Sequence, residues 1–175
     1  MNLLLFGGNS IRNKDWINQC AKEFQPLFKI CKVHHYEHWQ KQEDSIDIPK
    51  ELHNIALEVI NFNNYAVFTK SIGMILAARA IYEGIIKPQK CIFLGLPIGV
   101  INKDKNAISD YFKSIKKPIL FIQNNNDPVG SDEQVRNYLL EINPSDYSLE
   151  LYQGNTHSYK NFDILNKQIN NFING

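Results

Sequence analysis

The sequence contains few cysteines and no excess of charge of either sign. Its three cysteines, Cys20, Cys31 and Cys91, are odd in number and form no CxxC pair. This pattern argues against a disulfide framework and favours a reducing compartment, so we expect a cytoplasmic protein. Lysine and arginine number 19, aspartate and glutamate 18, and the net charge is +1. Because no basic field is available to displace counterions from a phosphate backbone, we expect no nucleic-acid partner.

Long apolar runs are also missing. Residues 1–8 have no basic flank, and their apolar run is too short for a signal peptide or a membrane span. No other stretch approaches membrane length, so we expect no membrane partner. Hydrophobic residues make up 43% of the chain, which is too apolar for intrinsic disorder. The length of 175 residues predicts one domain over residues 1–175, with a core that needs no disulfide or metal support.

Short apolar runs alternate with helical periodicity along the chain. The apolar runs predict strands over residues 3–6, 28–35, 65–69, 91–94, 119–122 and 147–152. Helical spacing predicts helices over residues 16–24, 49–60, 72–81, 107–115, 135–140 and 162–172, and residues 37–44 form a polar stretch. This alternation predicts an α/β fold, a three-layer α/β/α sandwich around a doubly wound, mostly parallel six-stranded sheet. Ligands bind beyond the carboxyl ends of such strands.

The segment Thr69-Lys70-Ser71-Ile72-Gly73 lies directly between a predicted strand and an alanine-rich helix. A nucleophile on a tight strand-to-helix turn needs small residues two positions before and after it, and Thr69 and Gly73 meet that need. Ser71 would also stand at a helix N-terminus, which favours developing negative charge. The alternative interpretation is that Ser71 only caps the helix.

Two further polar residues follow predicted strands. Asp127 comes after the fifth strand in Asn126-Asp127-Pro128, and His157 comes after the sixth in Thr156-His157-Ser158. Alone, Asp127 is equally consistent with a turn before Pro128, and His157 with a solvated loop residue. Together they suit a serine hydroxyl, which needs an imidazole to accept its proton and a carboxylate to orient that imidazole. The chain order of Ser71, Asp127 and His157 is the order found in α/β-hydrolases.

The first predicted strand ends in Phe6-Gly7-Gly8-Asn9-Ser10. Glycines let backbone N–H groups approach a substrate oxygen closely, so the N–H groups of Gly8 and Ile72 are our candidates for an oxyanion hole. The alternatives are a simple tight turn, or a phosphate-cradling loop of a flavodoxin-like or nucleotide-binding domain. The second alternative lacks both the GxGxxG pattern and a Walker lysine.

With these motifs, almost the whole chain resembles the α/β-hydrolase superfamily, and most of all its small, lid-free bacterial serine hydrolases. Phe6-Gly7-Gly8-Asn9 stands where that superfamily commonly has His-Gly-x-Gly, and residues 69–73 stand where it has Gly-x-Ser-x-Gly. The resemblance implies nucleophile, acid and base roles for Ser71, Asp127 and His157. We expect no cofactor. Phe6 and Thr69 depart from the pattern, and the first two strands of the full-size fold are missing.

Other polar residues border the same predicted edge. We expect Asn9, Lys70, Tyr36 and Trp39 to contact the substrate, with Lys70 exposed and the two aromatic rings at the mouth of the site; the alternative for the rings is a solvated loop with one anchoring aromatic. The run His34-His35-Tyr36-Glu37-His38 has no second ligand cluster to complete it, so we predict no metal site. Asp104 and Asp110 are reserve candidates for the acid.

The sequence therefore predicts a serine hydrolase that cleaves a small-molecule ester, thioester or amide through an acyl-enzyme. The residues between Leu94 and Pro118 are too few for a large cap, which favours small acyl substrates. The alternative is a catalytically inactive binding module that keeps the hydrolase fold. The sequence fixes no oligomeric state.

Overall fold

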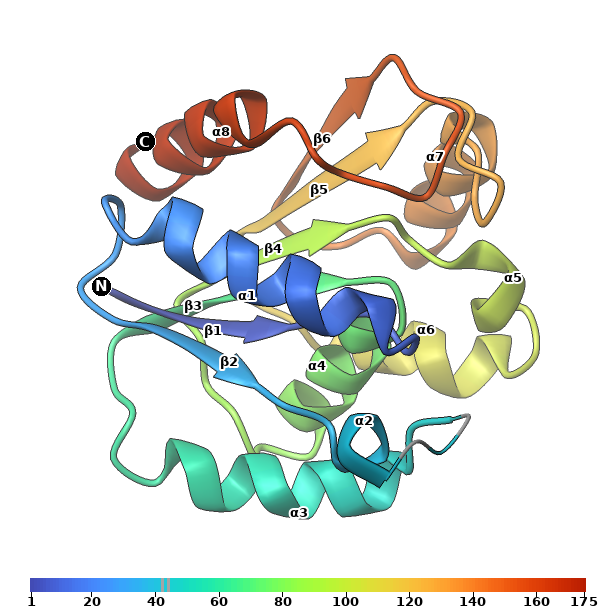
Figure 1. The fold of residues 1–175 in the computed structure, drawn as a ribbon. Helices are drawn as coiled ribbons and strands as arrows, with labels where there is room; N and C mark the ends of the chain where they lie inside the picture. Colours follow the sequence, from blue (N-terminus) through green and yellow to red (C-terminus); the bar gives the residue numbers. More distant parts are fainter. Residues whose placement is uncertain (42, 44) are drawn as a thin grey trace.

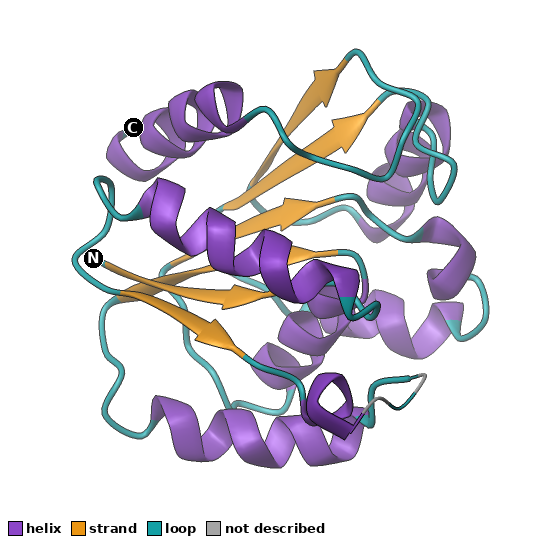
Figure 2. Cartoon of the chain, in the orientation of Figure 1, coloured by secondary structure: helices purple, strands orange, loops and turns teal. Residues whose placement is uncertain are grey.

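A computed structural model of the chain describes residues 1–41, 43 and 45–175. Its centre is a six-stranded sheet in the order β2-β1-β3-β4-β5-β6, and every pair of neighbours is parallel. Figures 1 and 2 show the sheet between two layers of helices. The strands are β1 (Asn2–Phe6), β2 (Cys31–His34), β3 (Tyr65–Lys70), β4 (Lys90–Leu94), β5 (Ile119–Asn124) and β6 (Tyr147–Tyr152). The predicted α/β/α sandwich is confirmed.

Eight helices occur in the described part of the chain. They are α1 (Arg12–Phe24), α2 (Glu37–Lys41), α3 (Ile48–Val59), α4 (Ile72–Tyr82), α5 (Ile98–Ile101), α6 (Lys105–Lys113), α7 (Asp132–Ile142) and α8 (Phe162–Asn174). Helices α1 and α8 pack against each other on one face of the sheet, whereas α4 packs between α3 and α6 on the other (Figure 1). None of the described helices is both long and apolar enough to cross a membrane.

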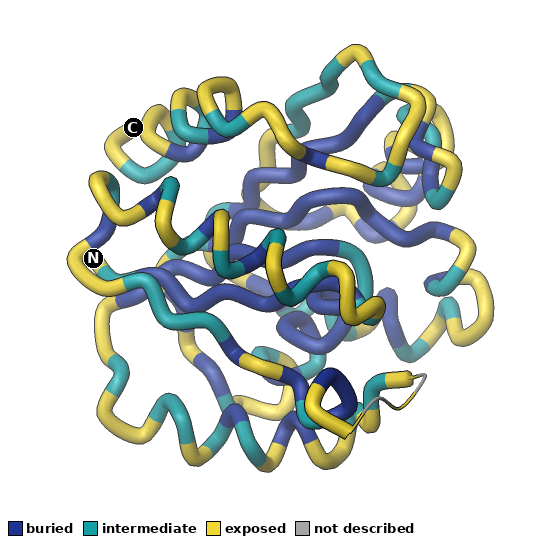
Figure 3. The backbone as a smooth tube through the Cα atoms, in the orientation of Figure 1, coloured by how far each residue is buried: buried dark blue, intermediate teal, exposed yellow. Residues whose placement is uncertain are grey.

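Burial follows the position of each strand in the sheet. The residues of β3 and β5 are buried throughout, whereas those of the edge strand β6 are exposed or half-buried (Figure 3). Helices cover both faces of the inner strands, so these strands need apolar side chains on both faces, which explains their continuous apolar runs. Helix α4 buries residues on all sides because it lies between the sheet and its neighbouring helices.

Two helices were not predicted. The polar stretch 37–44 contains α2, and residues 42 and 44 of that stretch lie outside the described residues. The N–H of Glu37, which begins α2, donates to the Glu51 carboxylate at 2.7 Å, so a residue far along the chain stabilises this short helix. Helix α5 is a single turn after Pro97.

Candidate active site

Ser71 occupies a strained turn between β3 and α4. Its φ of 55° and ψ of −122° are rare for a residue with a side chain. Two backbone hydrogen bonds hold the turn: the Ser71 N–H donates to the Leu94 carbonyl at 3.0 Å, and the Ser71 carbonyl accepts from the Met74 N–H at 2.9 Å. Such strain in an over-determined turn is the geometry expected of a nucleophile lifted above the sheet.

Gly73 lies in the first turn of α4, against the loop that follows β1. A Cβ atom on Gly73 would lie 2.4 Å from the Gly7 carbonyl oxygen and 3.0 Å from that of Phe6. Backbone atoms cannot withdraw as a flexible side chain can, so only glycine fits here. On the other flank of the turn, Thr69 is fully buried, and its hydroxyl has no hydrogen-bond partner among the described residues.

The N–H groups of Gly8 and Ile72 lie at the topological switch point of the sheet. From β1 the chain continues to β2 on one side, and β3 pairs with β1 on the other. Ile72 is the first residue of α4, and its N–H therefore has no acceptor within the helix. The Gly8 N–H has none among the described residues either. Two unused donors at a switch point suit the binding of a negatively charged oxygen.

Asp127 and His157 form a hydrogen-bonded pair at the ends of β5 and β6. His157 Nδ1 lies 2.8 Å from Asp127 Oδ2, and the Asp127 side chain is fully buried. The other carboxylate oxygen accepts the Val129 N–H at 2.9 Å. With Nδ1 donating to a carboxylate, Nε2 becomes the free acceptor of the imidazole. In the part of the chain that the structure describes, Nε2 is buried and has no hydrogen-bond partner.

The His157 ring packs against the end of β4. A Cβ atom on Gly95 would lie 2.7 Å from Cε1 of His157, and Gly95 itself has a φ of 66°. Gly95 directly follows Leu94, whose carbonyl accepts the Ser71 N–H. The imidazole and the strained serine thus lie on the same edge of the sheet, as their positions after β6 and β3 predict.

Tyr159 is a partner of Asp127 that the sequence analysis did not identify. Its hydroxyl donates to Asp127 Oδ2 at 2.9 Å and accepts the Asn124 N–H at 3.2 Å. Burial raises the pKa of Tyr159 well above its usual value, so the hydroxyl stays a donor. The carboxylate thus has two side-chain donors, His157 and Tyr159. The role of Tyr159 follows only from its position next to Asp127 in the fold, because no spacing in the sequence indicates it.

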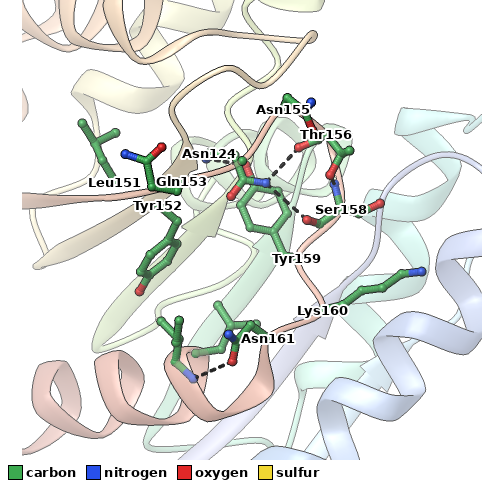
Figure 4. A pocket seen from close by; sticks show the side chains of 13 residues that line it. Asn124, Leu151, Tyr152, Gln153, Asn155, Thr156, Ser158, Tyr159, Lys160 and Asn161 are labelled. Atoms are coloured by element: carbon green, nitrogen blue, oxygen red, sulfur yellow. Dashed lines mark hydrogen bonds between the residues drawn. The ribbon is translucent and has the colours of Figure 1, made fainter.

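The loop that carries His157 is tied to β5 by one side chain. Asn124 Nδ2 donates to the carbonyls of Thr156 at 2.8 Å and Ser158 at 3.2 Å, as Figure 4 shows. A cavity of about 520 Å³ adjoins this loop, lined by residues such as Asn124 and Tyr159 but not by Ser71 or His157. Asn124 therefore holds both sides of the catalytic-histidine candidate in place.

Three expectations about the border of the site are wrong. Lys70 is not exposed: its ammonium donates to Asn13 Oδ1 at 2.9 Å, lies 5.3 Å from the Trp16 ring centre, and has its pKa lowered by burial. Tyr36 and Trp39 do not line the mouth, because both are buried behind the loop that follows β1. Nothing in the sequence around Lys70 indicates that residues of α1 cover its side chain.

The loop of residues 7–9 receives several hydrogen bonds from the segment after β2. The Tyr36 hydroxyl donates to the Gly7 carbonyl at 2.8 Å. The Asn9 carbonyl accepts from Trp39 Nε1 at 2.9 Å and lies 2.6 Å from His38 Nε2. The Asn9 side-chain oxygen accepts the Ile46 N–H at 2.9 Å. Tyr36 and Trp39, which we expected to contact a substrate, thus donate to the backbone of this loop instead, and the Asn9 side chain accepts from Ile46.

The remaining candidates lie elsewhere. Asp104, which precedes α6, and Asp110, which lies in α6, are both exposed. Among the described residues, neither hydrogen-bonds to Asp127 or His157. His34 pairs with Glu51 at 3.0 Å and Glu58 at 3.1 Å. Burial lowers its pKa, but the hydrogen bonds and charges of the two carboxylates outweigh burial and raise the pKa above its usual value. Within the described ranges, no three His, Cys, Asp or Glu side chains gather closely enough to hold a metal ion.

Comparison with known proteins agrees with this architecture. The family model described as "Alpha/beta hydrolase domain" matches residues 28–173. An uncharacterized protein from Bacillus cereus is similar with a TM-score of 0.77 and 14% identity, over 99% of this chain and 60% of that chain. The chain therefore spans about three fifths of that protein's length. Est1E from Butyrivibrio proteoclasticus, solved with ferulic acid bound, has a TM-score of 0.75 and 15% identity, over 98% of this chain and 87% of its own.

A third similar structure is alpha/beta hydrolase domain-containing protein 10 from mouse. Its TM-score is 0.69 and its identity 13%, over 99% of this chain and 89% of that chain. The comparison with curated proteins gave no match. At these identities the solved structures support only the fold, whereas the family model supports a relationship to that family.

Proposed function

The chain belongs to the alpha/beta hydrolase domain family, and from this premise we propose that it is a serine hydrolase with Ser71 as nucleophile, His157 as base and Asp127 as the orienting acid. The observation that carries the proposal is the Asp127–His157 hydrogen bond of 2.8 Å, which leaves Nε2 without a partner among the described residues. The His157 ring packs against Gly95, the residue after Leu94, whose carbonyl accepts the Ser71 N–H. An imidazole in this state accepts the proton of a serine hydroxyl.

The proposed reaction is acyl transfer to water. Ser71 attacks the carbonyl carbon of the substrate while His157 Nε2 takes the hydroxyl proton. The N–H groups of Gly8 and Ile72 bind the oxyanion of the tetrahedral intermediate. His157 then gives its proton to the leaving group, and water, activated by the same imidazole, releases the acid from the acyl-enzyme. The Asp127 carboxylate stabilises the imidazolium through its hydrogen bond to Nδ1.

We propose a small ester, thioester or amide as substrate. Helices α5 and α6 occupy the connection between β4 and β5, and they pack on each other and on α7 and α4. This connection therefore leaves no separate cap over the candidate site among the described residues. A site without a cap offers little apolar surface to a long acyl chain.

A fluorophosphonate probe tests the nucleophile directly. We expect the folded chain to be labelled, and Ser71→Ala and His157→Ala to lose most labelling and most turnover of p-nitrophenyl acetate without unfolding. The two effects should not add in the double variant, because the residues act as one unit. A folded chain that neither reacts nor hydrolyses would instead support the binding module. A panel of p-nitrophenyl esters tests the substrate class, and a preference for long chains would refute it.

A further inference from the structure

The peptide between Gly7 and Gly8 is held in one orientation by a single buried hydroxyl. Tyr36 is fully buried, and its hydroxyl donates to the Gly7 carbonyl at 2.8 Å. A Cβ on Gly73 would lie 2.4 Å from that carbonyl oxygen and 2.9 Å from the Tyr36 hydroxyl, so this hydrogen bond packs against the first turn of α4. The Gly7 carbonyl therefore points inward, toward α4 and Tyr36.

A peptide plane then fixes the direction of the next N–H. The chain has no cis peptide bond among its described residues, and in a trans peptide the C=O and N–H point in opposite directions. The Gly8 N–H therefore points away from Tyr36 and has no acceptor among the described residues. Two consecutive glycines would otherwise let this peptide rotate, since glycine has few steric restrictions.

The other end of the loop is held from the same segment. The Asn9 carbonyl accepts from Trp39 Nε1 at 2.9 Å, and Trp39 lies in α2. Helix α2 is itself tied to α3, because the Glu37 N–H donates to Glu51 at 2.7 Å. The loop thus has fixed points on both sides of Gly8, which is the condition for a preorganised donor.

We propose that Tyr36 is a positioning residue for the oxyanion hole. Its hydroxyl holds the Gly7 carbonyl, and through the rigid peptide it directs the Gly8 N–H at the carbonyl oxygen of the substrate. The role rests on the proposed serine-hydrolase function, because it needs an oxyanion to bind. Tyr36 itself contacts no substrate.

The test is Tyr36→Phe, which removes the hydroxyl and keeps the ring. The matched control is Tyr138→Phe, since Tyr138 is also buried, and among the residues that the structure describes its hydroxyl hydrogen-bonds only to Ser109, at 3.3 Å. Rates are measured on p-nitrophenyl acetate and on its thionoacetate, in which sulfur replaces the carbonyl oxygen. They are divided by the number of sites that a fluorophosphonate labels at completion, so that unfolded protein does not count.

We expect Tyr36→Phe to lower kcat on the oxygen ester roughly tenfold to a hundredfold with little change in KM, since the loss of one oxyanion donor outright costs about a hundredfold to a thousandfold. Sulfur accepts hydrogen bonds poorly, so the oxygen-to-sulfur rate ratio should fall as well. Tyr138→Phe should keep the wild-type ratio.

Two results overturn the role of Tyr36 alone: an unchanged kcat, or an equal loss on both esters, which would mean that the hydroxyl acts only through folding. In both cases the wild-type chain still hydrolyses the ester through Ser71, and the proposed function stands. A wild-type chain with no Ser71-dependent labelling or turnover overturns the proposed function and this inference together.

Discussion

Replacing Gly73 with alanine tests whether the nucleophile turn and the loop after β1 are packed as tightly as the structure shows. The new Cβ would lie 2.4 Å from the Gly7 carbonyl oxygen, 2.9 Å from the Tyr36 hydroxyl and 3.0 Å from the Phe6 carbonyl oxygen. Carbon and oxygen in contact normally stand more than 3 Å apart, so α4 or the Gly7 peptide must shift. Either shift moves one of the two proposed oxyanion donors.

Overpacking of this kind costs about 1–3 kcal/mol. In a domain of this size each kcal/mol changes the melting temperature by about 2–4 °C, so we expect Gly73→Ala to melt roughly 2–12 °C below the wild type. In an ordinary helix the same substitution would stabilise the protein by up to about 1 kcal/mol, so the sign of the change separates the two cases.

The matched control is Gly99→Ala in α5. A Cβ atom there would meet nothing within 4 Å, so alanine should leave the melting temperature unchanged or slightly higher. Thermal unfolding followed by circular dichroism measures both variants, and ester hydrolysis by the folded fraction measures the displacement of the donors. If Gly73→Ala melted at the same temperature as the wild type and Gly99→Ala, the close packing of α4 against the Gly7 carbonyl would be refuted.

Three further predictions concern single side chains. Asp127→Asn should lower kcat on p-nitrophenyl acetate by roughly a thousandfold or more, because the amide removes the acceptor that sets the His157 tautomer; near-full activity would reject this acid and return attention to Asp104 and Asp110. The pKa of His34 is raised in the folded state, so protonation of His34 should stabilise the fold. This stabilisation is complete below the unfolded-state pKa of about 6.5 and is lost as the pH rises through the folded-state pKa. Urea midpoints of the wild type should therefore fall more steeply than those of His34→Gln as the pH rises above about 6, and parallel curves would contradict the assignment. Thr69→Val should raise the unfolding free energy by about 1 kcal/mol, since it removes a buried hydroxyl with no partner among the described residues, whereas a loss of stability in urea titrations would point to a partner.

The sheet could be predicted from the sequence because its strands carry a strong local signal. Strands β3 and β5 are buried on both faces, so each forms a continuous apolar run. A parallel sheet also places the ends of its strands at one edge, which is why Ser71 and His157 could be assigned to the same region from their positions alone. The common direction of the parallel strands was enough for that assignment.

The supporting contacts could not be predicted, because they join residues far apart in the chain. The hydrogen bond from Tyr159 to Asp127 and the one from Tyr36 to Gly7 depend on how the loops lie over the sheet. Lys70 was misjudged for the same reason: a charged residue beside a turn is usually solvated, and only the packing of α1 buries it. Short helix α2 escaped prediction because a remote carboxylate, on Glu51, caps it.

These long-range contacts explain how the chain tolerates a strained serine. A backbone conformation such as that of Ser71 costs about 1–3 kcal/mol and persists only where its surroundings leave no alternative. Here β4 holds the Ser71 N–H, α4 holds its carbonyl, and Gly73 lies against the Gly7 peptide. Relaxing the serine would break these contacts, and it would also misdirect Gly8. The same packing that maintains the strain thus sets the proposed nucleophile and the proposed oxyanion donor at a fixed separation.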